Sequence, residues 1–307
     1  LSCLYPLYTD VLLSLEKALV VKNKLEELSQ RTIAELHRDL EAYLNADVFT
    51  YYGSIVNGVE RQVKDIIEAL ANDSSKHDRI FVVLTTSGGS LIPVQRIVDV
   101  LRHYYREVNF IIPDYAFSAG TIWCMSGDNI YMNYYSALGP IDPQVQNKDG
   151  KLVAALGYLD KINELLQKAQ ARTLTEAEFL ILKDFDLAEL RSYEQAKELA
   201  IDMLKEWLTK YKFKDWTVHS STKQPVTKAD KEQRAIEIAQ KLSDNNRWKF
   251  HGRPIGIDTL TNELHLTIVD FGKEPELNQK ISEYYDVMYE YIAKHGFQTF
   301  FQTRLYL

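Results

Sequence analysis

The stretch IFVVLTTSGGS, residues 80–90, decides the fold class. Its first seven residues form a continuous run rich in β-branched side chains, which is typical of a buried parallel strand. The turn that follows contains Gly88 and Gly89, and glycine leaves backbone N–H groups uncovered and open to close approach. We therefore expect a buried strand whose carboxyl end presents accessible backbone donors.

Strands and helices alternate after this stretch. The pattern predicts a helix, a buried strand, a short helix and another strand, at residues 91–106, 108–113, 118–126 and 129–133. This alternation predicts an α/β fold with a mostly parallel sheet flanked by helices and right-handed crossovers. Active sites of such folds lie at the carboxyl ends of the strands, where the turns 87–90 and 118–120 both fall.

Composition narrows the function classes. The chain has 307 residues, 46% of them apolar, and a net charge of -7, which argues against nucleic-acid binding. No apolar run is long enough for an integral membrane segment, and the first 25 residues do not resemble a signal peptide. Two cysteines are typical of a reducing compartment, so we expect a cytoplasmic protein. No phosphate-binding glycine loop or zinc-ligand spacing is present, so no cofactor and no metal are expected.

Three segments are predicted. Residues 1–50 would form an N-terminal helical arm, with one long helix or two over 9–45. Residues 51–272 would form the α/β domain, with residues 139–152 as a loop and a helical insertion over about 157–245. Residues 273–307 would form a C-terminal helical extension. The apolar period does not say whether the arm packs on its own domain or joins subunits.

Ser118 lies in the stretch DYAFSAGTIWCMSGD, residues 114–128. Serine at the start of a helix is commonly an N-cap. A serine at this position is also a candidate nucleophile, because the helix dipole favours negative charge on its oxygen and the small Ala119 and Gly120 leave space beside it. The local sequence alone leaves both interpretations open.

Three motifs in order resemble the serine dehydrogenase proteinase family. They read TSGG at 86–89, AFSAGT at 116–121 and LGPIDPQ at 138–144, where the family typically has TPGG, AMSAGT and LGP-I/V-DPQ. That family belongs to the Clp-protease/crotonase superfamily and is related to the signal-peptide-peptidase-A type enzymes. The close resemblance covers roughly residues 78–165. Ser87 replaces the family's proline, but both glycines remain.

The resemblance implies a Clp-protease/crotonase-like fold and an acyl-transfer site. Ser118 would be the nucleophile, and backbone amides of Ala119 and of the Gly88-Gly89 turn would form the oxyanion hole. It implies a serine peptidase with a peptide or protein substrate. It also implies a homo-oligomer, with the helical terminal regions as candidate interfaces.

The general base is less clear from the sequence. Clp-type enzymes have a histidine in the segment that here reads GPIDPQ, and none is present. The signal-peptide-peptidase branch has a lysine about forty residues after its serine, and Lys161 follows Ser118 by 43 residues. Lys151 is a rival in a polar turn. A lysine serves as a base only when its surroundings lower its pKa, whereas most helical lysines are solvated surface charges.

Further candidates have structural alternatives. His251 is either a distant base or a hydrogen-bonded structural residue, and Asp142 either supports a neighbour or ties down its loop. Cys124 is expected in the core. Two other functions stay open, namely a weak or inactive oligomeric scaffold of the same fold and a crotonase-like acyl-CoA enzyme. The latter requires carboxylates near the acyl site, for which the sequence gives no clear sign.

Overall fold

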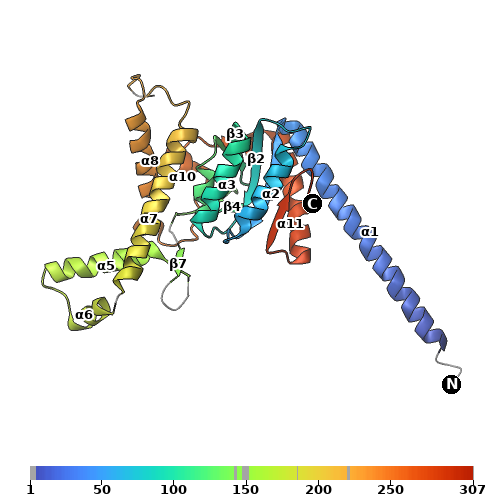
Figure 1. The fold of residues 1–307 in the computed structure, drawn as a ribbon, viewed down its shortest axis with the longest axis horizontal. Helices are drawn as coiled ribbons and strands as arrows, with labels where there is room; N and C mark the ends of the chain where they lie inside the picture. Colours follow the sequence, from blue (N-terminus) through green and yellow to red (C-terminus); the bar gives the residue numbers. More distant parts are fainter. Residues whose placement is uncertain (1–4, 142–143, 147–151, 185, 220–221, 307) are drawn as a thin grey trace.

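The alternating segment folds into a six-stranded sheet (Figure 1). In the computed structural model the described residues are 5–141, 144–146, 152–184, 186–219 and 222–306, with the backbone alone for 5–23, 144–146, 152–156, 187 and 245. The strands, in spatial order, are β10 (Thr299–Gln302), β1 (Asp47–Gly53), β2 (Arg79–Thr85), β3 (Glu107–Ile111), β5 (Asn129–Met132) and β9 (Val269–Asp270). All pairs are parallel except β1 with β10. The predicted mostly parallel sheet is confirmed.

Two short ladders lie outside this sheet. Strand β4 (Tyr115–Ala116) pairs in parallel with β6 (Ala137–Leu138) and so joins the Ser118 region to the segment that follows β5. Strands β7 (Gln144–Gln146) and β8 (Leu152–Ala154) form an antiparallel pair. The expected loop at 139–152 therefore contains β7 and ends where β8 begins.

Helices cover both faces of the sheet, and β2 shows why. Ile80, Val82 and Leu84 lie in one hydrophobic cluster, whereas Phe81 and Val83 lie in the other. The first cluster includes side chains of α2 (Val59–Ala71), α3 (Leu91–Tyr104) and α4 (Ala119–Cys124), and the second includes those of α1 (Tyr5–Leu44) and α11 (Pro275–His295). Because both faces are buried, the strand reads as a continuous apolar run rather than an alternating one.

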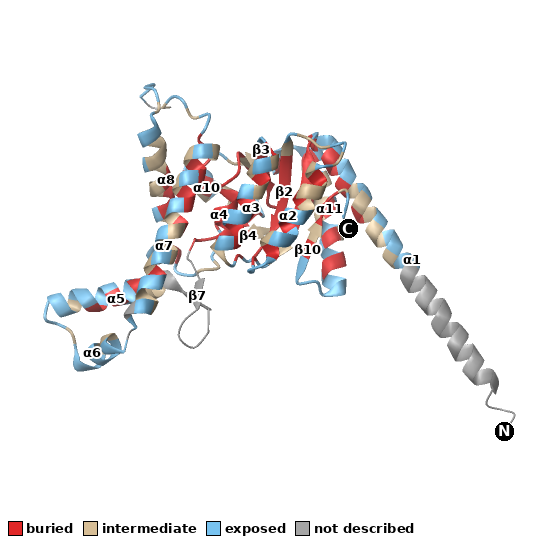
Figure 2. Ribbon diagram, in the orientation of Figure 1, coloured by how far each residue is buried: buried red, intermediate tan, exposed pale blue. Residues whose placement is uncertain are grey.

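A helical insertion follows β8. Its elements are α5 (Ala155–Gln170), α6 (Glu176–Lys183), α7 (Leu187–Trp207), the π-helical turn η1 (Leu208–Lys212), α8 (Lys228–Leu242), α9 (Asn245–Trp248) and α10 (Ile257–Asn262). Helices α7 and α8 pack on the core, whereas α5 and α6 project away from the sheet and are largely exposed (Figures 1 and 2). Among the helices that the structure describes, none is both long enough and apolar enough to span a membrane.

Both termini contribute to the sheet layer, which differs from the expected segment boundaries. Strand β1 begins at Asp47, inside the range assigned to the arm, and α1 is one continuous helix. Residues 299–302, expected to be helical, form β10, because Phe300 packs into one cluster and Phe301 against the other. Past the short turn η2 (Phe271–Lys273), α11 is a core helix. Adjacent side chains that pack on opposite faces are the pattern of a strand.

Arg304 attaches the C-terminal tail to the end of α1 and to β1. Its Nη1 lies 2.9 Å from Oδ1 of the fully buried Asp47 and 3.2 Å from Oε1 of Glu41, and its Nη2 lies 3.2 Å from Asp73. Tyr105 donates to Asp47 Oδ2 over 2.7 Å. A buried carboxylate requires such partners, so the C-terminal tail is fixed on α1 and β1.

Candidate active site

A pocket of about 690 Å³ lies where β2 ends. It is lined by Ser118, the turn 87–90, the segment 54–57 after β1, and apolar side chains that include Ile122, Ile141 and Leu199. Both glycine-containing turns thus meet at one pocket, at the strand ends where the sequence predicted them. None of the described residues that line the pocket has a titratable side chain.

The Gly88–Gly89 turn is held by the backbone of Ile55. The Ile55 N–H donates to Gly88 O, and the Ser90 N–H donates to Ile55 O, each over 2.8 Å. Because a trans peptide points its C=O and N–H in opposite directions, the Gly89 N–H points away from Ile55. Both glycines have positive φ, 98° and 142°. A Cβ on Gly89 would lie 2.1 Å from Ile55 O, so the position requires glycine.

Thr86 connects this turn to the Ser118 turn. Its Oγ1 accepts a hydrogen bond from the Gly88 N–H over 3.0 Å. Its backbone N–H donates to Tyr115 O over 3.1 Å, and its carbonyl accepts from the Phe117 N–H over 2.9 Å. The Thr86 side chain therefore fixes the glycine turn while its backbone fixes the serine turn.

Ser118 has a strained backbone and a hydroxyl that is not used for capping. Its φ and ψ are 53° and −117°, and its relative exposure is 4%. It occupies the N-cap position of α4, but its side chain makes no capping hydrogen bond. A strained residue in a pocket is characteristic of functional sites. The cap interpretation thus accounts for the position of Ser118 and leaves its hydroxyl available.

Two backbone donors stand beside Ser118. Ala119 is the first residue of α4, so its N–H has no intrahelical acceptor. Within the described part of the chain, neither this N–H nor that of Gly89 donates a hydrogen bond, whereas the Gly88 N–H is taken by Thr86. A Cβ built on Gly88 would lie 2.7 Å from Ser118 Cβ and 3.2 Å from Ala119 N, which shows how closely the turns approach. Such paired donors can hold an anionic oxygen.

The third motif is attached by Thr121. Its Oγ1 donates to Ala116 O over 2.8 Å and accepts from the Gly139 N–H over 3.0 Å. Gly139 packs against Phe117, where a Cβ would lie 2.9 Å from the ring. All three sequence motifs therefore meet around Ser118 through hydrogen bonds of two buried threonines.

The candidate bases lie outside this pocket. The Lys161 side chain, on α5, is 53% exposed and its Nζ lies 2.9 Å from Glu164 Oε2. His251 does not line the pocket either, and partial burial lowers its pKa. Asp142 and Lys151 lie outside the described residues. Cys124 is fully buried in the core as expected, and this burial raises the pKa of its thiol.

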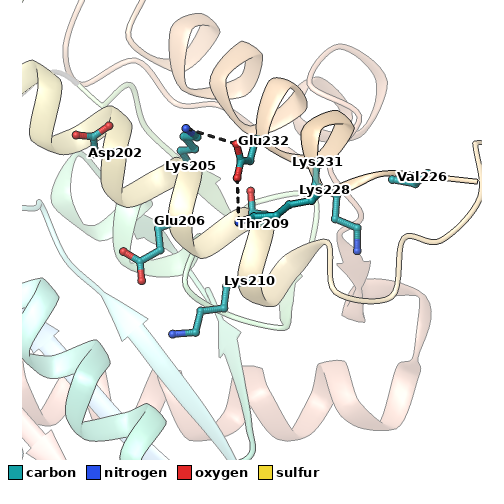
Figure 3. A pocket seen from close by; sticks show the side chains of 9 residues that line it. All are labelled: Asp202, Lys205, Glu206, Thr209, Lys210, Val226, Lys228, Lys231 and Glu232. Carbon is teal, nitrogen blue, oxygen red and sulfur yellow. Dashed lines mark ion pairs between the residues drawn. The ribbon is translucent and has the colours of Figure 1, made fainter.

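A second pocket, of about 670 Å³, lies between α7 and α8 and does not include Ser118 (Figure 3). Glu232 lies between Lys205 and Lys228 there, at 3.6 Å and 3.5 Å. Two of the four lysines of this lining thus pair with the same surface carboxylate. No cluster of three or more potential metal ligands occurs among the residues that the structure describes.

Sequence reasoning missed Ile55 and the separate roles of Thr86 and Thr121. Thr86 and Thr121 stand inside the quoted motifs, so their hydroxyls were visible as candidate acceptors. Ile55 was not identifiable, because its contact with Gly88 joins residues 33 positions apart through backbone atoms that any residue type possesses.

A model of the ClpP-like SDH-type serine proteinase family matches residues 2–227. Two uncharacterised proteins of Methanocaldococcus jannaschii are also similar. One is 32% identical over 27% of this chain and 28% of its own length, and the other is 26% identical over 39% and 42%. The chain thus matches less than half the length of these curated relatives.

Two solved protease structures show a weak similarity to this chain. A variant of the 1510-N membrane-bound stomatin-specific protease covers 51% of this chain and 82% of that chain, with 20% identity and a TM-score of 0.30. The ClpP protease catalytic domain from Plasmodium falciparum covers 48% and 79%, with 15% identity and a TM-score of 0.27.

The requirement for glycine at position 89 is testable against a matched control. Gly89→Ala should lower the free energy of unfolding by about 3 kcal/mol or prevent folding, because the new methyl meets Ile55 O and φ is positive. Gly58→Ala has φ 98° but open space around it, and should cost only about 1 kcal/mol. Urea unfolding measures both. Equal losses in the two variants would show that contact with Ile55 is unimportant.

Proposed function

The chain belongs to the ClpP-like SDH-type serine proteinase family, and we propose that it cleaves peptide bonds through an acyl-enzyme on Ser118. The observation that carries the proposal is that Ser118 has a strained backbone, makes no capping hydrogen bond, and lies in one pocket beside two backbone N–H groups that donate to no described acceptor. This arrangement supplies a nucleophile together with stabilisation for the oxyanion that its attack would produce.

The proposed reaction uses the backbone as follows. Ser118 Oγ attacks the substrate carbonyl carbon, and the carbonyl oxygen becomes an oxyanion. The Gly89 and Ala119 N–H groups donate to that oxygen. Gly88 holds the turn in position, because its carbonyl accepts a hydrogen bond from Ile55 and its N–H donates one to Thr86. The amine leaves with a proton, and water then hydrolyses the ester to regenerate Ser118. Removal of one such donor from an oxyanion hole costs roughly 10²–10³ in rate.

The proposed base is Lys161, which must be neutral to accept the Ser118 proton. Its ammonium is exposed and paired with Glu164 in this structure. A base role therefore requires α5 to carry the amine to Ser118 and out of water, as cover by a substrate or by a second copy of the chain would do. A homo-oligomer that acts on peptides in the cytoplasm is part of the same proposal, with His251 and Asp142 as supporting residues.

The second candidate function is an inactive scaffold of the same fold. It is favoured by the observation that no described residue lining the Ser118 pocket can accept a proton. The same lining offers no carboxylate for a crotonase-like acyl-CoA reaction. Covalent labelling distinguishes the peptidase from the scaffold.

Ser118 should react with a fluorophosphonate probe in the folded protein. The probe phosphonylates an activated serine, so mass spectrometry should locate the adduct on Ser118, and Ser118→Ala should abolish it with an unchanged melting temperature. Ser126→Ala is the matched control, because that buried hydroxyl already donates to Trp123 O over 2.7 Å. No adduct on folded wild-type protein would favour the scaffold.

The role of Lys161 can be tested against its neighbour. Lys161→Ala should slow phosphonylation of Ser118 by roughly 10²–10⁴, the usual contribution of a general base. Lys168→Ala should not, although Lys168 also lies on α5 and pairs with Glu164, at 3.0 Å. Labelling rates across pH 6 to 10 provide the comparison. If both variants react like the wild type, Lys161 is not the base.

Thr86 should position the glycine turn through its hydroxyl. Thr86→Val keeps the shape but loses the acceptor of the Gly88 N–H, so phosphonylation should slow by about 10²-fold, in line with a small misplacement of catalytic groups. Thr86→Ser keeps the acceptor and should retain most of the rate. A valine variant that is folded and as fast as the serine variant would contradict this role.

A further inference from the structure

A pocket of about 830 Å³ lies at the end of the sheet opposite to Ser118. Its lining includes Glu107 and Asn129, which begin β3 and β5, and Thr267, which precedes β9. The candidate active site follows the carboxyl ends of the strands, so this pocket at their amino ends is separate from it. Its volume is in the range of small-molecule sites.

Lys212 lines this pocket at the end of η1. Its Nζ lies 3.3 Å from the backbone oxygen of Asp128. The Asp128 carboxylate is occupied by other groups, namely Arg102 Nη1 at 2.8 Å, Lys214 Nζ at 2.5 Å and the Val108 N–H at 2.8 Å. Among the described residues, no carboxylate oxygen lies within 4.0 Å of Lys212 Nζ, so this amine lacks an ion pair.

Desolvation of an amine that has no ion-pair partner disfavours its ammonium form. Desolvation lowers the pKa of Lys212 to about 8, and the charge of Asp128 opposes this effect only in part. At pH 7.5 an amine with this pKa is neutral roughly 200 times more often than one with the ordinary value near 10.4. A desolvated, neutral lysine amine is the form that attacks carbonyl carbon.

We propose that Lys212 is an amine nucleophile that forms imines with small aldehydes entering this pocket. The neutral Nζ adds to the aldehyde carbon to give a carbinolamine. The carbonyl oxygen then leaves as water together with the two hydrogens of the amine, and a C=N double bond to Nζ replaces the C=O bond. The step needs no oxidant or reductant, and hydrolysis reverses it. It is independent of the peptidase proposal.

The lining indicates which aldehydes fit. Tyr211 and Trp216 supply aromatic surface. The guanidinium of Arg102, which belongs to α3, lies 3.7 Å from the centre of the Tyr211 ring. Besides Lys212 and Tyr211, the charged or titratable groups of the lining are Glu107, Asp128, Lys214, Asp215, Arg234 and His265. Acidic and basic groups are mixed there, so the pocket favours an uncharged, flat aldehyde over an anionic one.

The test is reductive labelling of the folded full chain with benzaldehyde and cyanoborohydride, which traps imines as stable benzylamines. Peptide mass spectrometry should show Lys212 labelled at least tenfold faster than Lys210 at pH 7.5. Lys210 is the internal control, because it belongs to the same turn, is exposed and lies over the same Tyr211 ring. The labelling rate of Lys212 should rise with pH to a plateau with a midpoint near 8.

Two results would overturn the proposal. One is equal labelling of Lys212 and Lys210 in the folded protein. The other is labelling of Lys212 only above the denaturation midpoint in urea. Lys212→Met should remove the fast-labelled site and leave phosphonylation of Ser118 unchanged. The comparison of Lys212 with Lys210 is made in the wild-type protein, so it tests the proposal even if this variant does not fold.

Discussion

The hydrogen bond from the Gly88 N–H to Thr86 Oγ1 is the interaction on which the site geometry depends. Without an acceptor at that point, the turn after β2 would have one orphaned buried donor, and only the backbone hydrogen bonds to Ile55 would hold its two glycines. The same residue bridges Tyr115 and Phe117 through its backbone, and its Cγ2 would lie 2.3 Å from a Cβ on Gly120. One buried threonine therefore sets the distance between two turns that 28 residues of chain separate.

The strain at Ser118 follows from this attachment. Its φ of 53° is unfavourable for an L-residue and costs of order 1–3 kcal/mol. Neighbouring bonds hold it in place, because Phe117 is fixed by Thr86 on one side and Thr121 is fixed to Ala116 and Gly139 on the other. The strained serine persists since its neighbours are held on both sides, and its hydroxyl does not make the capping hydrogen bond that an N-cap serine ordinarily makes.

The sequence predicted what local pattern encodes. Strand β2 was identifiable because burial on both faces produces an uninterrupted apolar run, and the motif glycines because their positive φ excludes other residues. Strand β10 was not, since Thr-Phe-Phe-Gln is a strand only through pairing with β1, some 250 residues away. The role of Ile55 is equally non-local. The surroundings of Lys161 depend on how α5 packs, which residue spacing does not encode.

Burial, rather than position in a motif, decides which lysine can give up its proton. Lys161 stands at the spacing of a catalytic lysine, but its side chain is exposed and its amine is paired with Glu164. Lys212 has the opposite environment, because its amine is desolvated and no carboxylate oxygen of the described residues lies within 4.0 Å of it, yet it lies at the amino ends of the strands. A peptidase that uses Lys161 must therefore desolvate that amine near Ser118, as the fold already desolvates Lys212 at the amino ends of the strands. In the homo-oligomer proposed above, the exposed apolar residues Phe179, Leu180 and Ile181 of α6, beside α5, would be a surface for that cover.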